Sequence, residues 1–185
     1  MTSATMYGMR KLVDIDLLDD EALQAGMAMD SLWIVLAGLV AGVLGAVALP
    51  HEALGPGWFV LLGVLSAVAL PVHELVHAAA FRLLSHGSAH VRFGFHSWML
   101  YTSAAGTVLS RGRFCVVLLA PAVLVTATLG VSATCAGWPL LGWALSVVHL
   151  AGCTGDFGYV RIIASEPQAR MVEDTDSGIS LYAED

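Results

Sequence analysis

Charged side chains are scarce in this sequence of 185 residues: they make up 12% of it, whereas 57% of the residues are hydrophobic and the mean hydropathy is +0.77. An ordinary soluble domain carries about 25% charged residues. The composition therefore excludes an ordinary soluble domain. It predicts an integral membrane protein whose first partner is the lipid bilayer.

Positive charge and cysteine are also in short supply. The chain has eight Lys and Arg residues, only one of them a lysine, and a formal net charge of −7. A nucleic-acid-binding protein needs a cluster of positive charge, so no nucleic acid is expected as a partner. The three cysteines stand in apolar segments at no paired spacing, which argues against a disulfide framework.

Four apolar runs are long enough to cross a bilayer as helices. At 1.5 Å per residue, about 20 helical residues match the roughly 30 Å hydrocarbon core. We therefore expect an all-α membrane protein with four transmembrane helices. The predicted membrane domain is 31–163, and its spans cover about residues 31–50, 57–84, 114–133 and 138–163.

The basic residues predict the orientation of these spans. The links 51–56 and 134–137 contain no Lys or Arg, whereas basic residues precede the first span, follow the fourth and lie between the second and third. The positive-inside rule then places both termini in the cytoplasm. We expect a multi-pass protein of the cell membrane with an acidic N-terminal segment, 1–30, that lacks a signal-peptide pattern, and an acidic tail, 164–185.

Residues 85–113 are too polar for a span and too apolar for an ordinary loop. Residues 91–96 alternate with the period of two that is typical of a strand, and residues 97–109 are rich in strand-forming and small residues. We expect a short β-hairpin at the membrane interface, between the second and third spans. It either presents an edge to an extended peptide or serves as an interfacial anchor.

The second predicted span contains the motif His73-Glu74-Leu75-Val76-His77. Residues four apart share one face of a helix, so His73 and His77 can bind a single Zn²⁺ while Glu74 addresses a water on that ion. Ionisable groups at bilayer depth are costly and rarely lack a partner or a function. The alternative is a pair of core histidines whose nitrogens are satisfied by backbone carbonyls.

Asp156, in the fourth predicted span, is a candidate for the third zinc ligand. At 1.5 Å per residue, His73 and Asp156 lie at about the same depth in spans that run in the same direction. Two His and one Asp would leave the fourth position of the zinc ion open, as in catalytic sites. One alternative is that Asp156 forms an ion pair with an arginine such as Arg82. The other candidates for the third ligand are Cys153 and His149.

With HELVH in one span and Gly155-Asp156 in a later one, the chain resembles the site-2-protease-like membrane zincins over roughly residues 30–175. It is most similar to their small four-span zincin peptidase family. The resemblance implies a zinc metallopeptidase with His73, His77 and Asp156 as ligands and Glu74 as the general acid and base. His149 lies near the family's asparagine position, so it is expected to donate to the oxyanion, to hold a zinc ligand in place through a hydrogen bond or to be a core residue.

The predicted function is therefore zinc-dependent hydrolysis of peptide bonds within or beside the membrane, on a membrane protein or peptide substrate. The alternative is a membrane zinc-binding protein, such as a sensor or an interaction subunit, that keeps the fold without proteolysis. Glu74 distinguishes the two, because hydrolysis needs it and zinc binding does not. A metal transporter is disfavoured because no chain of polar residues crosses the apolar spans.

Overall fold

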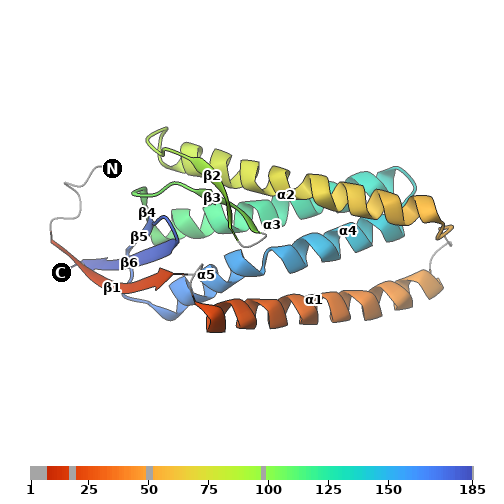
Figure 1. The fold of residues 1–185 in the computed structure, drawn as a ribbon, viewed down its shortest axis with the longest axis horizontal. Coiled ribbons are helices and arrows are strands. Elements are labelled where there is room, and N and C mark those ends of the chain that lie inside the picture. The colour runs from red at the N-terminus through yellow and green to blue at the C-terminus, as the bar shows by residue number, and fades with distance from the viewer. Residues whose placement is uncertain (1–7, 17–19, 49–51, 97–98, 185) are drawn as a thin grey trace.

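The computed structural model describes residues 8–16, 20–48, 52–96 and 99–184. In Figure 1 the long helices run side by side along the molecule, and the first and last described strands lie together at one end. In chain order the elements are β1 (Met9–Asp16), α1 (Glu21–Ala48), α2 (Pro56–Leu84), β2 (Arg92–His96), β3 (Met99–Ser103), β4 (Val108–Ser110), α3 (Arg111–Cys135), α4 (Pro139–Gly152), α5 (Thr154–Ser165), β5 (Met171–Asp174) and β6 (Gly178–Glu184).

The described helices are consistent with a multi-pass membrane protein. By length and composition α1, α2 and α3 can each cross a bilayer, and α4 with α5 makes a fourth candidate if the bent pair is one span. Large apolar side chains cover the outward faces of the helices, among them Leu39, Leu44, Val60 and Val64. Soluble monomers rarely expose apolar surface so continuously, whereas lipid tails cover it at no cost.

Small residues hold α1 against α4. A side chain at Gly38 would overlap Val147, and a side chain at Gly42 would crowd the indole of Trp143. The same indole donates a hydrogen bond from Nε1 to the carbonyl oxygen of Gly38 at 2.9 Å. Close backbone approach at small residues is how membrane helices gain packing contacts without a hydrophobic driving force.

The fourth predicted span is bent. The chain turns by 51° between α4 and α5, with Cys153 at the break, whereas a continuous helix is expected over 138–163. Gly152 and Gly155 flank the break, and glycine lowers helix propensity by about 1 kcal/mol relative to alanine. The bend starts a new helix, whose first turn carries Asp156.

The prediction of an all-α fold is wrong in one respect, because β1, β5 and β6 join β4, from the middle of the chain, in a four-stranded sheet of the order β1-β6-β5-β4. We call it the C-terminal sheet, because β5 and β6 are its two central strands. All of its pairs are antiparallel, and Met9 opposite Glu184 marks one end of the β1–β6 register. Val172, Ile179 and Leu181 of this sheet are buried in one cluster with Phe114 of α3. That apolar contact holds the acidic terminal segments on the helices.

One helix boundary and the strands of residues 85–113 can be compared with the sequence prediction. Helix α1 begins at Glu21 instead of residue 31, after Asp20, whose Oδ1 accepts a hydrogen bond from the Leu23 N–H at 2.9 Å as a helix cap. Its predicted end at residue 50 lies outside the described residues. Strands β2 and β3 pair antiparallel within 85–113, with Arg92 opposite Ser103. Their location at a membrane interface stays a prediction.

Candidate metal centre

Helix α2 places the two motif histidines on one face, and the carboxylate of Glu74 is buried beside them. The residue His77 is 7% exposed, and its Nδ1 lies 3.0 Å from the carbonyl oxygen of Val117 in α3. A carbonyl only accepts, so Nδ1 carries the proton. In the neutral imidazole Nε2 then presents a lone pair, which is the state required of a metal ligand.

Asp156 meets both histidines from α5. Its Oδ2 lies 3.3 Å from His73 Nε2, and its Oδ1 lies 3.2 Å from His77 Nε2. The carboxylate stands in the first turn of α5, where the positive end of the helix dipole favours negative charge. Arg82, the alternative partner, is exposed. In the described chain the ion pairs of Asp156 are with the two histidines.

The three donor atoms lie as close together as the ligands of one zinc ion, or slightly closer. The two Nε2 atoms lie 3.0 Å apart and each lies within 3.3 Å of a carboxylate oxygen. Zinc bonds of about 2.0–2.2 Å with tetrahedral angles separate the ligand atoms by about 3.3–3.5 Å. Lone pairs that face one another at this distance repel unless a cation or a proton lies between them. The three residues form a group that could hold a metal ion.

His149 lies behind His73, not beside Asp156. Its Nε2 is 3.2 Å from His73 Nδ1, and its Nδ1 is 2.8 Å from Thr126 Oγ1. If Nε2 of His73 is a ligand, its Nδ1 carries the proton and donates to His149, which in turn donates from Nδ1 to Thr126. Both ring nitrogens of His149 then have partners, and its part in oxyanion binding stays a prediction.

Cys153 belongs to a second group that could hold a metal, with His73 and His149. Its Sγ lies 3.8 Å from Nδ1 of each of these rings and donates to the carbonyl oxygen of His149 at 3.2 Å. The two groups share His73, through Nδ1 in one and Nε2 in the other. The second group contains neither His77 nor a carboxylate, so it leaves the rest of the motif without a role.

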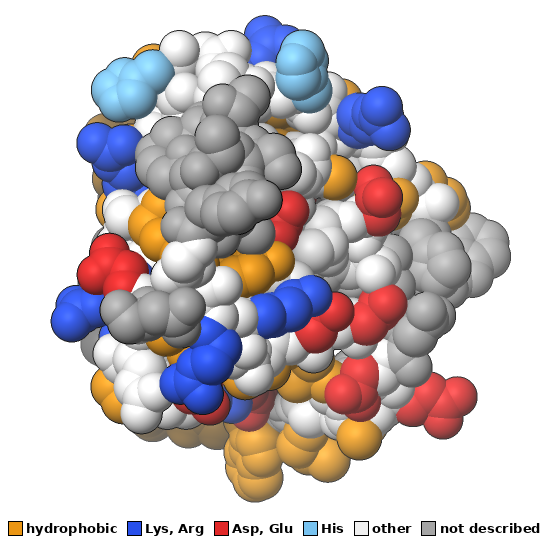
Figure 2. Space-filling view, turned by 90° about the vertical axis from the view of Figure 1, so that its left-hand side faces the viewer, with side chains coloured by type: hydrophobic (Ala, Val, Ile, Leu, Met, Phe, Trp, Pro, Cys, Tyr) orange, Lys and Arg blue, Asp and Glu red, His pale blue; other side chains and the backbone are white. Residues whose placement is uncertain are grey.

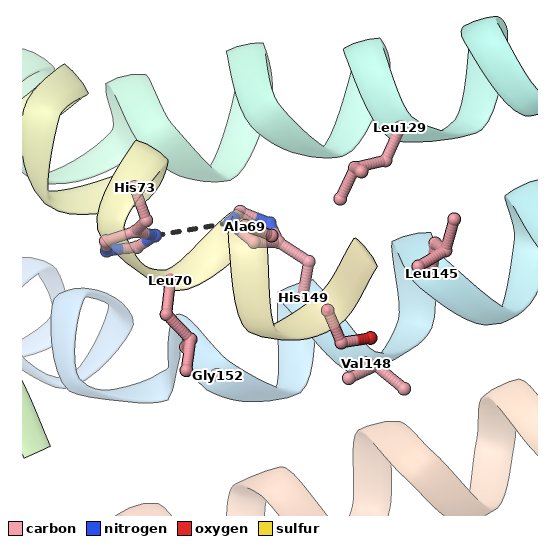
Figure 3. A pocket seen from close by; sticks show the side chains of 9 residues that line it. Ala69, Leu70, His73, Leu129, Leu145, Val148, His149 and Gly152 are labelled. Carbon is pink, nitrogen blue, oxygen red and sulfur yellow. Dashed lines mark hydrogen bonds between the residues drawn. The ribbon is translucent and has the colours of Figure 1, made fainter. Parts of the chain in front are cut away.

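An open cleft of about 830 Å³ gives access to the centre. His73, Glu74, His77 and Asp156 line it together with residues 100–103 of β3. A second, smaller cavity of about 70 Å³ adjoins it behind His73 and shares Leu70 and Gly152 with the cleft (Figure 3). A side chain added at Gly152 would meet no neighbouring atom, so this glycine leaves open space between α2 and α4.

Three contacts at the centre were not predicted from the sequence. Thr102 Oγ1 donates to the carbonyl oxygen of Glu74 at 3.0 Å, Thr126 holds His149, and Asp174 lines the cleft from the C-terminal sheet. A threonine in an apolar segment carries no sequence signal for such a partner. Asp174 stands among the other acidic residues of the tail, and only its burial separates it from them.

Two histidines one helical turn apart and a facing carboxylate make up the donor set of a zincin-type centre. A second carboxylate next to the first histidine stands where such a centre has its general base. The chain belongs to the family described as "Putative zincin peptidase", whose model matches residues 66–171. The matched segment includes His73, Glu74, His77, His149 and Asp156. No curated protein and no solved structure matches the chain.

Proposed function

We propose that the protein is a zinc-dependent protease that hydrolyses peptide bonds within or beside the membrane. One observation carries the proposal: the two motif histidines and Asp156 converge on one point, beside the buried Glu74, at the wall of an open cleft. Membership of the zincin peptidase family supports the same chemistry.

His73, His77 and Asp156 would hold the ion, and Glu74 is the proposed general base. When bound, zinc supplies Lewis acidity and lowers the pKa of a water toward 7. Glu74 accepts the proton of the attacking water and passes it to the leaving amine. Helix α2 places Glu74 next to His73 in the chain, and the hydrogen bond from Thr102 to its carbonyl oxygen holds that turn of the helix.

We propose that the substrate binds along the edge of strand β3. Within the described residues β3 pairs with β2 alone, and the four consecutive residues 100–103 all line the cleft. Successive side chains of a strand point to opposite faces, so a run of consecutive lining residues indicates that the edge of β3 borders the cleft. An extended peptide could add to this edge through main-chain hydrogen bonds.

The proposed setting is the cell membrane, with both termini and the strands on the cytoplasmic side. Lys, Arg, Asp, Glu and His side chains gather at the end of the molecule shown in Figure 2. At the opposite end, the links 52–55 and 136–138 carry no Lys or Arg. This asymmetry supports the orientation that the positive-inside rule predicts.

The test compares the membrane proteome of cells that carry the wild-type protein with that of cells carrying Glu74→Gln. The variant keeps all three ligands, so zinc content should stay near one equivalent. Hydrolysis should fall by several orders of magnitude because water loses its proton acceptor. Precursors that accumulate with Glu74→Gln and are cleaved with the wild type would identify substrates.

A proteome that is the same for the two proteins, with zinc bound in both, would contradict the protease proposal. It would favour the alternative, a membrane zinc-binding protein that acts as a sensor or an interaction subunit. Glu21→Gln is a matched control, because it makes the same change at an exposed position of α1.

A further inference from the structure

Asp174 is a buried carboxylate of the C-terminal sheet that lines the same cleft as the metal centre. Its side chain is 8% exposed, and it ends β5 just beyond residues 66–171, which the family model matches. A buried carboxylate costs several kcal/mol unless hydrogen bonds compensate for the lost water. Its partners therefore indicate what the residue does.

Those partners lie at the end of β3 and in the loop that follows. Oδ2 of Asp174 accepts hydrogen bonds from the Ala104 N–H at 2.6 Å and from Ser103 Oγ at 3.2 Å. The backbone of Asp174 pairs with the same loop, since its N–H donates to the Thr107 carbonyl oxygen and its carbonyl oxygen accepts from the Gly106 N–H. Four hydrogen bonds thus join this one residue to residues 103–107.

The fixed end of β3 lies next to the turn of α2 that carries the proposed base. Ser103, which Asp174 holds, follows Thr102 in the chain, and Thr102 Oγ1 donates to the carbonyl oxygen of Glu74 at 3.0 Å. The link therefore runs from the C-terminal sheet through β3 to the metal-binding turn. The turn after Asp174 also borders the cleft, through residues 175–178.

We infer that Asp174 is a positioning residue that holds the cleft-facing edge of β3 against the Glu74 turn, so that the C-terminal hairpin β5–β6 helps to seat the substrate. This inference rests on the proposed protease function. It gives the β5–β6 hairpin, which lies beyond the family match except for Met171, a part in substrate binding. The turn is held on its other side as well, because Ser177 Oγ donates to Asp16 Oδ2 of β1 at 2.6 Å.

The protonation state of Asp174 sets the conditions of the test. Burial raises the pKa of this carboxyl to about 7, and the hydrogen bonds from Ala104 and Ser103 oppose that rise. At pH 8 most molecules carry the ionised form, which accepts both hydrogen bonds. The measurements therefore use the full-length, zinc-loaded protein in detergent micelles at pH 8.

The first measurement is hydrogen exchange of residues 99–107 in the wild type, Asp174→Ala and Asp174→Asn. Asp174→Ala should speed exchange of the Ala104 amide at least roughly tenfold, because it removes a charge-assisted acceptor. The amides of α2 and the zinc content should not change. Glu184→Gln is the control, since this carboxylate of β6 is exposed and is not among the residues that line the cleft. Unchanged exchange in Asp174→Ala would overturn the inference even if no proteolysis is ever found.

The second measurement is cleavage of fluorescein-labelled casein, an unstructured model polypeptide. Asp174→Ala should raise KM about tenfold and change kcat less than about threefold, because binding is disturbed and the metal centre is not. Asp174→Asn should recover part of the loss, since its amide oxygen can still accept from Ala104.

Two further results would overturn the inference. One is a KM of Asp174→Ala equal to that of Glu184→Gln. The other is a loss of zinc or of α2 protection in Asp174→Ala, which would mark a residue needed only for folding. If the wild type does not cleave casein, the protease proposal loses support, and hydrogen exchange alone decides whether Asp174 fixes β3.

Discussion

Nδ1 of His73 lies 3.2 Å from Nε2 of His149, so a ring from α4 orients the imidazole that faces Asp156. His149 is itself held by Thr126, at 2.8 Å from Nδ1. A fixed hydrogen-bond partner of a ligand ring sets the tautomer and the direction of that ring, and its loss commonly costs 10- to 100-fold in metal affinity.

His149→Ala should therefore weaken zinc binding by about 10- to 100-fold, as measured by competition with a chelator of known affinity. His149→Gln should lose less, because its amide oxygen can accept the hydrogen bond that the Nδ1–H group of His73 donates. If His149→Ala binds zinc as tightly as the wild type but loses turnover, the oxyanion role is favoured instead.

The third ligand can be identified by comparing Asp156→Ala with Cys153→Ser. Asp156→Ala should lower zinc occupancy nearly as much as His77→Ala, because both remove an atom that faces the shared point. Cys153→Ser should leave occupancy intact, since its thiol donates to the carbonyl oxygen of His149. Elemental analysis of the purified variants measures both.

A matched control for the ligand test is Asp30→Ala. It removes a carboxylate that lies away from the metal centre and pairs with Arg161 at 3.0 Å. A Co²⁺-substituted protein adds an independent measurement, because thiolate ligation gives an intense charge-transfer absorption that carboxylate ligation lacks. Such a band, lost in Cys153→Ser, would assign the metal to the group of His73, His149 and Cys153.

The histidine pair was predictable from the sequence because helical periodicity is local: a spacing of four places His73 and His77 on one face whatever surrounds them. The contact of these histidines with Asp156 was predictable because His73 and Asp156 lie at about the same depth in two spans that run in the same direction. By contrast, the pairing of β1 with β6 joins residues as far apart as Met9 and Glu184. No local pattern reports such a long-range contact, and the acidic residues of these segments resemble those of a solvated tail.

The break at Cys153 was missed for a related reason. Hydropathy averages over a window of about 20 residues, so it merges α4 and α5 into one apolar run. The glycines on either side were the available signal, but glycine is also common in continuous membrane helices. Because of the break, α5 begins at Thr154 and Asp156 lies in its first turn. This placement depends on how the helices pack, which a hydropathy window does not report.

Topology can be tested with single cysteines introduced into a variant that lacks the three native ones. Ala53→Cys and Ala136→Cys should react with a membrane-impermeant maleimide in intact cells, because their links carry no basic residues. Ser88→Cys and Gln168→Cys should react only after the cells are opened. The reverse labelling would place the strands and the metal-site cleft on the outer side.

Glu52 caps α4 from the link between α1 and α2, at the end of the molecule opposite the strands. Its carboxylate accepts hydrogen bonds from the backbone N–H groups of Leu140 and Leu141, in the first turn of α4, and from Trp58 Nε1 at 2.9 Å. The first N–H groups of a helix have no partner within the helix, and a carboxylate there also meets the positive end of the helix dipole. One side chain thus joins the link to the starts of α2 and α4.

Glu52→Ala should lower the free energy of unfolding by about 1–2 kcal/mol, because it leaves the first turn of α4 without its cap. Glu52→Gln should lose less, since its amide oxygen still accepts one N–H but carries no charge. Thermal unfolding in detergent micelles measures the loss, with Glu184→Ala as the control for removing an exposed carboxylate. Zinc content should not change, because the ligands lie on other turns of α2 and on α5. An unfolding temperature of Glu52→Ala equal to that of the wild type would show that the link does not anchor α4.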